Sequence, residues 1–467
     1  MAKAIVKTIG ATISQARKAT RHVVDRLPPT WALVIGYAAY MVFLWVFLSL
    51  PLALEVNKSG DADSLDHAFV AVSAVSTTGL STVDVGATYS FWGELAILTA
   101  IQLGGLGYMT LGSFVLLAIG NQLSGDRIRI GRLCFHLPPT LPLRRFLKRV
   151  VIYTFCLEAL GAAVLWFQFD GVSESTTRVW AAIFHSISAF CTAGFSTFPD
   201  SLEQYRSNGV VNAVVILLSL AGALGFILFN DLWSKLTNWS EHQFSLTSRV
   251  ILASSCGAIS IATTVFYFSE SELFVLSNFD HFLIAVFQAI SALTTVGFNT
   301  YPISGFAHSG LFLLLLLMTL GASPAGTGGG LKSTTWMTGI AALISALTFG
   351  RSGHVYAFGR EIPTRRVVAA FAAITLYVLC LFVGTFALLW VEPSQDMASL
   401  SFEAASALGT VGLSTGVTGD LGDSARWIVM ALMFVGRAGP LTIALALSSM
   451  LPESDTTEDE PEEDLAL

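Results

Sequence analysis

The sequence has 467 residues, of which 54% are hydrophobic and only 12% charged, with a mean hydropathy of +0.68 and a formal net charge of −7. A soluble domain carries about 25% charged residues, so this composition excludes an ordinary water-soluble globular protein and indicates one that folds in lipid. The five cysteines have no metal-ligand spacing, and we interpret them as small apolar residues. We expect no cofactor in this chain and no nucleic-acid partner.

In chain order, the sequence predicts a basic cytoplasmic N-terminus at residues 1–29, four similar modules, and an acidic disordered tail at 452–467. Each module reads as an outer apolar helix, a half-helix that reaches about halfway across a bilayer, a loop, and an inner apolar helix. The fold class is therefore an all-α integral membrane protein with eight transmembrane helices and four re-entrant half-helices. The modules are expected at 30–121, 147–233, 246–350 and 366–451, with outer helices near 30–51, 147–169, 246–268 and 366–390 and inner helices near 91–121, 209–233, 310–349 and 425–450.

One motif occurs in all four modules and defines them. Its pattern is F-x-x-x-S-A-x-x-T-x-G-[LF]-[SN]-T, beginning at Phe69, Phe184, Phe287 and Phe402, and six of its positions are identical in every copy. Chance does not place such matches at nearly even spacing, so the four copies are internal repeats.

Lysine and arginine positions predict the orientation, because cytoplasmic loops of membrane proteins carry an excess of positive charge. Nineteen of the 25 Lys and Arg residues fall at one predicted membrane face and four at the other. We therefore expect both termini in the cytoplasm and the motif loops to open outward, in a multi-pass protein of the bacterial plasma membrane.

The T-x-G stretches are the predicted functional site. Non-helical backbone at membrane depth must be buried in protein or line a water-filled path. Glycine permits a positive φ without steric cost, so successive carbonyls can face one axis, and rings of carbonyls replace the hydration shell of a potassium ion. Four such loops around one pseudo-fourfold axis predict a cation pore.

With these motifs the chain resembles the Trk/Ktr/HKT superfamily of potassium transporters, and among them the membrane subunit of the bacterial Ktr system. The resemblance implies a selectivity filter built from the backbone carbonyls of the four T-x-G stretches. Those residues are Thr77, Thr78, Gly79; Thr192, Ala193, Gly194; Thr295, Val296, Gly297; and Thr410, Val411, Gly412. In plant relatives a serine at the first glycine position is linked to sodium transport, so Gly79 favours potassium.

The third inner helix contains a predicted interruption, 321-GASPAGTGGGLKST-334, since its Gly and Pro residues cannot continue a helix. The resemblance implies that this intramembrane loop, 321–332, is the gate, and that the buried Arg437 faces the conduction path beneath the filter. The gate set is Gly321, Gly326, Gly328, Gly329, Gly330, Lys332 and Arg437. A phosphate-binding loop fails on spacing, because Leu331 separates Gly330 from Lys332. A structural kink without gating remains an alternative.

The resulting hypothesis is a pore-forming potassium uptake subunit and not an enzyme, with K⁺ as the transported ion and Na⁺ dependence left open. Alternatives are a sodium-permeable cation transporter of the same fold and a secondary transporter of another solute. By resemblance, the expected partners are a second copy in a homodimer, a cytoplasmic ring of nucleotide-binding (RCK-type) regulatory subunits, and membrane lipid. The basic segments 122–149 and 351–366 are plausible docking surfaces for the regulatory ring.

Overall fold

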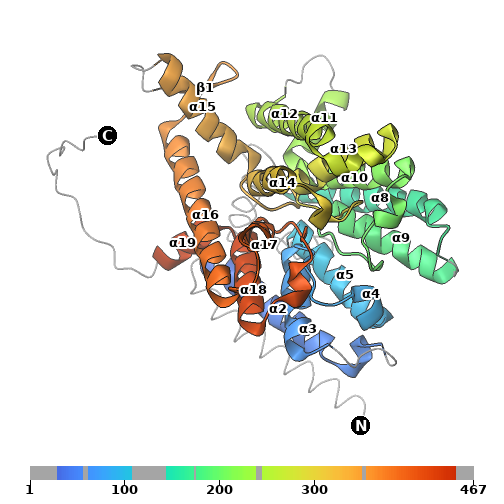
Figure 1. Cartoon of the computed structure of the whole chain (residues 1–467). Coiled ribbons are helices and arrows are strands. Elements are labelled where there is room, and N and C mark those ends of the chain that lie inside the picture. The colour runs from blue at the N-terminus through green and yellow to red at the C-terminus, as the bar shows by residue number, and fades with distance from the viewer. Residues whose placement is uncertain are drawn as a thin grey trace, which may run out of the picture.

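The structure is a computed structural model that describes residues 29–55, 62–107, 143–172, 175–237, 244–349 and 354–448 (Figure 1). Several predicted segments lie outside these residues. They are the basic N-terminus, most of the basic segment 122–149, the end of the first inner helix and the acidic tail.

Four long helices occupy the predicted outer positions. They are α2 (Pro29–Leu48), α8 (Leu143–Gln168), α12 (Leu246–Ser269) and α16 (Thr364–Val391). By length and composition, three described helices can cross a membrane, namely the stretches Leu147–Gln168, Leu246–Ser269 and Thr364–Val391. A bent pair, α10 with α11, would count as a fourth span. The prediction of a helical protein with apolar membrane-length helices is thus confirmed, whereas eight unbroken spans are not seen in the described residues.

A shorter helix follows each outer helix and carries the repeat motif. These four motif helices are α3 (Ser64–Ser76), α9 (Ser175–Phe190), α13 (Asn278–Thr294) and α17 (Met397–Gly409). The first, third and fourth begin at side-chain caps, supplied by Asp63, Ser277 and Asp396. Such caps satisfy backbone N–H groups that have no partner within the helix. The sequence thus marks where these three helices start.

Three of the inner segments are pairs of helices, and in all four segments a glycine with positive φ follows the first helix. Helix α5 (Phe91–Leu106) ends at Gly107, and the others are pairs: α10 (Gly209–Ala223) with α11 (Phe226–Thr237), α14 (His308–Leu320) with α15 (Ser333–Phe349), and α18 (Asp423–Ala438) with α19 (Pro440–Ser448). The glycines at the ends or breaks are Gly107, Gly225, Gly321 and Gly439. The interruption predicted in the third segment is present. The second and fourth segments, expected as single helices, differ from that expectation, and α10 and α11 meet at 98°.

The remaining described elements are small. They are α4 (Val85–Thr88), the 3-10 turns Pro51–Ala53, Glu203–Tyr205, Ser271–Val275, Ile303–Gly305 and Val417–Asp420, and the strands β1 (Val355–Ala357) and β2 (Arg360–Ile362). The strands pair antiparallel with Tyr356 opposite Glu361. This hairpin is an addition to the all-α class, and its turn contains Gly359 with a φ of 73°.

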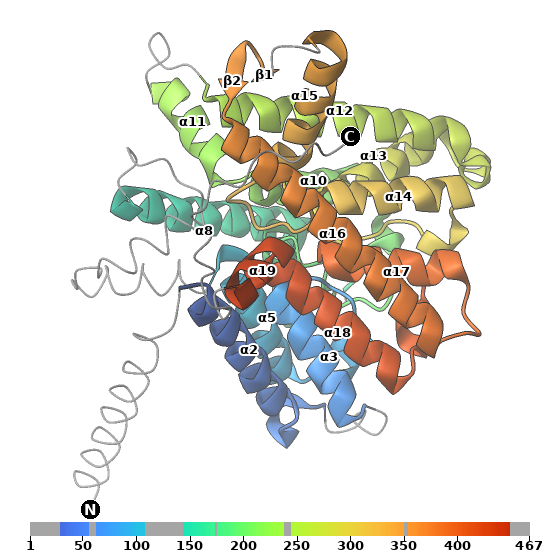
Figure 2. The same ribbon diagram turned by 90° about the vertical axis from the view of Figure 1, so that its left-hand side faces the viewer.

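The four copies pack in cyclic order. Helix α5 contacts α9 of the second copy, α10 contacts α13 of the third, α14 contacts α17 of the fourth, and α18 returns to α3 of the first. Figure 2 shows α18 beside α2 and α3, although these helices lie at opposite ends of the sequence. The phenylalanine that begins each motif is at most 1% exposed in all four copies, so it belongs to the core that holds the ring together.

Candidate functional site

Each motif helix ends at the first residue of its T-x-G stretch. Thr77, Thr295 and Thr410 are left-handed C-caps of their helices, and Thr192 has the same positive φ at the end of α9. A left-handed residue ends a helix, and for threonine it costs conformational energy that surrounding contacts must offset. The chain therefore turns from helix to loop at the same motif position in every copy.

The four glycines of the motif bring the four loops together. A Cβ atom added to Gly79 would overlap the carbonyl oxygen of Ala193 in the second copy. The same relation links Gly194 with Val296, Gly297 with Val411, and Gly412 with Thr78. Each loop thus touches the next and the last touches the first, which places all four around one centre. All four glycines also have positive φ, so a side chain at these positions would strain the backbone as well as crowd the neighbouring carbonyl.

The repeated serine of the motif holds each loop from behind. The backbone N–H groups of Gly79 and Gly412 each donate to a motif serine, Ser73 and Ser406, at 3.0 Å. In the other two copies the serine donates instead, Ser188 to the Phe195 carbonyl at 2.9 Å and Ser291 to the Phe298 carbonyl at 2.6 Å. These buried bonds fix the loop backbone relative to its helix.

The 321–332 loop lies directly against the helix-proximal ends of the motif loops. The Thr327 hydroxyl is 3.2 Å from that of Thr192, and the Gly329 N–H donates to the Thr295 hydroxyl at 2.8 Å. A Cβ on Gly329 would overlap the side chain of Thr410. The 321–332 loop therefore contacts three of the four predicted filter stretches.

Two cationic side chains bind the carbonyls of this loop. Arg437 Nη1 donates to the Thr327 carbonyl at 2.8 Å, and its Nη2 donates to the Gly104 carbonyl at the end of α5. Lys332 Nζ donates to the Gly328 carbonyl at 2.7 Å. Arg437 thus ties the loop to the first and fourth inner helices.

The second and fourth breaks were not predicted. Glycines three residues earlier, Gly104, Gly222 and Gly436, leave no space for a Cβ beside carbonyls of the motif helices. The shared G-x-x-G spacing at 104–107, 222–225 and 436–439 is the signal that could have located these breaks. The first glycine of each pair allows close packing against a motif helix, and the second has the positive φ.

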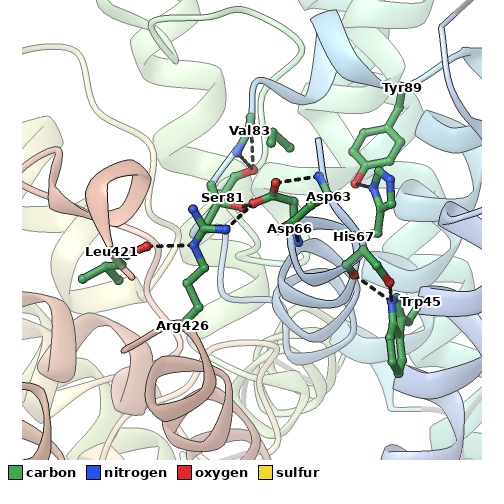
Figure 3. A network of polar contacts seen from close by, with 11 residues as sticks. Trp45, Asp63, Asp66, His67, Ser81, Val83, Tyr89, Leu421 and Arg426 are labelled. Carbon is green, nitrogen blue, oxygen red and sulfur yellow. Dashed lines mark hydrogen bonds and ion pairs between the residues drawn. The ribbon is translucent and has the colours of Figure 1, made fainter. Parts of the chain in front are cut away.

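A network at the opposite end of the motif helices joins the first and fourth copies (Figure 3). Arg426 at the start of α18 pairs with the Asp66 carboxylate at 3.1 Å and also donates to the Leu421 carbonyl at 2.9 Å. Asp66 in turn belongs to a capping box with Asp63. The Asp66 N–H bond lowers the pKa of the Asp63 carboxyl below its ordinary value.

Two further buried polar residues have partners in this region. His185 has its Nδ1 2.8 Å from the Ala181 carbonyl and its Nε2 2.9 Å from the Ser196 hydroxyl. The Glu158 carboxylate lies 3.9 Å from the Cys191 sulfur at the end of α9.

Comparison with known proteins gives one family. The family described as "TrkH: Cation transport protein" matches residues 34–459. The Ktr system potassium uptake protein B of Vibrio alginolyticus is 31% identical over 419 residues, which cover 88% of this chain and 90% of that protein. The potassium/sodium uptake protein NtpJ of Enterococcus hirae is 28% identical, covering 96% of this chain and 99% of that protein.

A solved structure shares the fold. The crystal structure of the potassium transporter TrkH from Vibrio parahaemolyticus superposes with a TM-score of 0.67 at 21% identity, covering 88% of this chain and 84% of that chain. At this identity the likeness concerns the fold alone.

Proposed function

Because the chain belongs to the TrkH family of cation transport proteins, we propose that it is the pore-forming subunit of a bacterial potassium uptake system. The family consists of potassium transporters and not of enzymes, which confirms both the resemblance and the prediction that the chain is not an enzyme. The finer proposal concerns the path of the ion through the four repeats.

In this proposal K⁺ passes through the centre of the four motif loops. The observation that carries it is the cyclic contact of each motif glycine with a carbonyl of the next loop. That contact brings main-chain oxygens from all four copies together without an intervening side chain, as carbonyl coordination of a dehydrated cation requires. The motif helices direct their C-terminal ends, which are partly negative, at the same place. Both features favour a cation.

The 321–332 loop is the proposed gate. It contacts the filter threonines on one side, and Arg437 and Lys332 hold its carbonyls. A loop with so many glycines has little side-chain packing to hold it, so its position depends on these polar bonds. Breaking them would free the path below the filter.

Transport is tested by measuring bacterial growth at low external potassium. The protein is produced in a bacterium that lacks its own potassium uptake systems. Restored growth supports the proposal, and failure by well-expressed protein in the membrane refutes it. Gly79→Ser is the matched test of the filter, with Gly257→Ser as a control, because a Cβ on Gly257 meets nothing within 4 Å. Only Gly79→Ser should admit more Na⁺ relative to K⁺.

A sodium-linked function is the second candidate. It is favoured by the similarity to NtpJ, whose name includes both potassium and sodium. In this version Na⁺ either permeates or couples to K⁺ entry. Measuring K⁺ uptake with Na⁺ replaced by choline separates the two candidates, because uptake that needs Na⁺ falls and uniport persists.

The proposed assembly is a homodimer in the plasma membrane with both termini in the cytoplasm. It would bind lipid around its apolar helices and a cytoplasmic ring of nucleotide-binding regulatory subunits. The support is that similar proteins are named as parts of a Ktr system. Copurification from detergent with a coexpressed regulatory subunit, and the mass of the complex, test this assembly. Recovery of the chain as a free monomer in both experiments would reject it.

A further inference from the structure

One motif position differs in chemistry among the four copies, although its place in each motif helix is the same. It directly follows the shared phenylalanine and is occupied by Val70, His185, Gln288 and Glu403. All four side chains are buried. Because the backbone around them repeats, a difference in what each side chain binds is a difference between the four loops.

In two copies this side chain binds the outer limb of its motif loop, the segment that follows the T-x-G stretch. In the fourth copy, Glu403 accepts from the Ser414 hydroxyl at 2.9 Å and from the Thr418 hydroxyl at 2.6 Å. In the second copy, His185 binds the hydroxyl of Ser196, which occupies the same motif position as Ser414. Hydrogen bonds to a buried carboxylate are among the stronger ones in proteins.

The first copy makes a similar contact from a different position and with the next residue of the loop. Val70 cannot bond, but Asp66 lies one turn earlier in α3 and accepts from the Thr82 hydroxyl at 2.6 Å. Asp66 is also the carboxylate that pairs with Arg426 (Figure 3). The outer limb of the first loop is thus held by its own motif helix and, through Asp66, is linked to the fourth copy.

The third copy has no such contact. Both amide atoms of Gln288 are buried without a hydrogen-bond partner among the described residues. Its loop carries Asn299 where Ser196 and Ser414 stand in other copies, and the Asn299 amide donates instead to Glu203 of the second copy, at 2.7 Å. Apart from the Ser291 bond to the Phe298 carbonyl, which has an equivalent in the second copy, the outer limb of the third loop is therefore held, among the described residues, from a neighbouring loop.

We propose that Glu403, His185 and Asp66 are positioning residues that clamp three filter loops and thereby maintain selectivity for K⁺ over Na⁺. The third loop has no equivalent of these three contacts among the described residues. This inference rests on the proposed function, because the loops must bind the ion for their position to affect selectivity. A smaller ion needs closer oxygens, and a clamped backbone resists the adjustment that would supply them. The clamps act through the loops and do not touch the ion.

Substitutions at the same motif position in two copies test the clamp. Purified protein is reconstituted into liposomes, and the ratio of K⁺ to Na⁺ flux is measured. Glu403→Leu should lower this ratio about fivefold to tenfold, the effect expected from losing a buried hydrogen bond. Glu403→Gln, which retains an acceptor, should restore much of it. The matched control Gln288→Leu should leave the ratio unchanged, because the Gln288 amide holds nothing.

A pair of changes on the loop side covers a failure of Glu403→Leu to fold. Ser414→Ala with Thr418→Val removes both hydroxyls and leaves the helix core intact, and it should lower the ratio to the same extent. Unchanged ratios in this pair and in any folded Glu403→Leu protein overturn the inference while K⁺ transport stands. An equal loss in Gln288→Leu also overturns it. Absence of K⁺ flux in the unsubstituted protein instead rejects the proposed function.

Discussion

Replacing Arg437 with methionine should increase K⁺ flux. Methionine has a similar length and no charge, so the change removes both bonds, to the Thr327 and Gly104 carbonyls, with little loss of volume. The 321–332 loop then loses a connection between α5 and α18. We expect the loop to leave its position beneath the proposed filter more often, and a positive charge that in this proposal faces the ion path is removed as well.

The size of the effect follows from the bond that joins Arg437 to the loop, the one to the Thr327 carbonyl. A hydrogen bond from a charged donor stabilises by about 1.5 to 3 kcal/mol. The lower value gives about 1.5 kcal/mol, and since about 1.4 kcal/mol changes an equilibrium tenfold, the displaced state gains about tenfold. Flux rises less once that state is common, so initial ⁸⁶Rb⁺ uptake into liposomes should increase about threefold to tenfold.

The matched control is Arg178→Met. Arg178 also donates to backbone carbonyls, those of Asp170 and Val172 at 3.1 and 3.0 Å, in a loop before the second motif helix. Its loss should leave flux within about twofold, the range of a surface change. Unchanged or reduced flux in Arg437→Met protein of normal abundance and melting temperature would refute the assignment of the loop as a gate.

Three other outcomes are expected. Lys332→Met should raise the same uptake by less than Arg437→Met, because its bond to the Gly328 carbonyl joins two residues of the loop itself; an equal or larger rise would contradict this order. Gly225→Ala should also raise flux, since Gly225 has a φ of 87° and an added Cβ would meet the Pro324 carbonyl and displace the loop; normal uptake would show that the loop tolerates the shift. The Asp63 cap contributes its full stability to α3 at pH values above the unfolded carboxyl pKa of about 3.9, and this stability is lost as the pH falls through the lower pKa of the folded state. The melting temperature should therefore decrease when the pH is lowered below about 4. Asp63→Asn should reduce that drop, and an identical pH profile would exclude this cap as a cause.

Local rules made much of the fold predictable. The motif carries a helix ending at threonine and a glycine two residues later, and both follow from backbone sterics that do not depend on distant contacts. The 321–330 stretch could be assigned as a break because several Gly and Pro residues act together. The outer helices were predictable from apolar length.

Other features depended on contacts that no short pattern records. A single glycine such as Gly225 or Gly439 costs a helix only about 1 kcal/mol, so the sequence alone did not decide between a tolerated glycine and a break. The contacts of Gly225 with the 321–332 loop decide it in the structure. The pairing of Asp66 with Arg426 spans 360 positions of sequence, and the function of Glu403 depends on a loop hydroxyl, so neither could be assigned from spacing.

The return of α18 to α3 has a consequence for biogenesis. During synthesis the first copy leaves the ribosome well before the fourth copy exists. The Asp66–Arg426 ion pair and the Gly412–Thr78 contact therefore cannot form until the last quarter of the chain has been made. Three copies inserted in the bilayer would therefore expose two unmatched flanks. Chains truncated before residue 397 should be recognised by membrane quality-control proteases. Complementary halves coexpressed in one cell should restore function only if the contacts between the first and fourth copies can form between separate polypeptides.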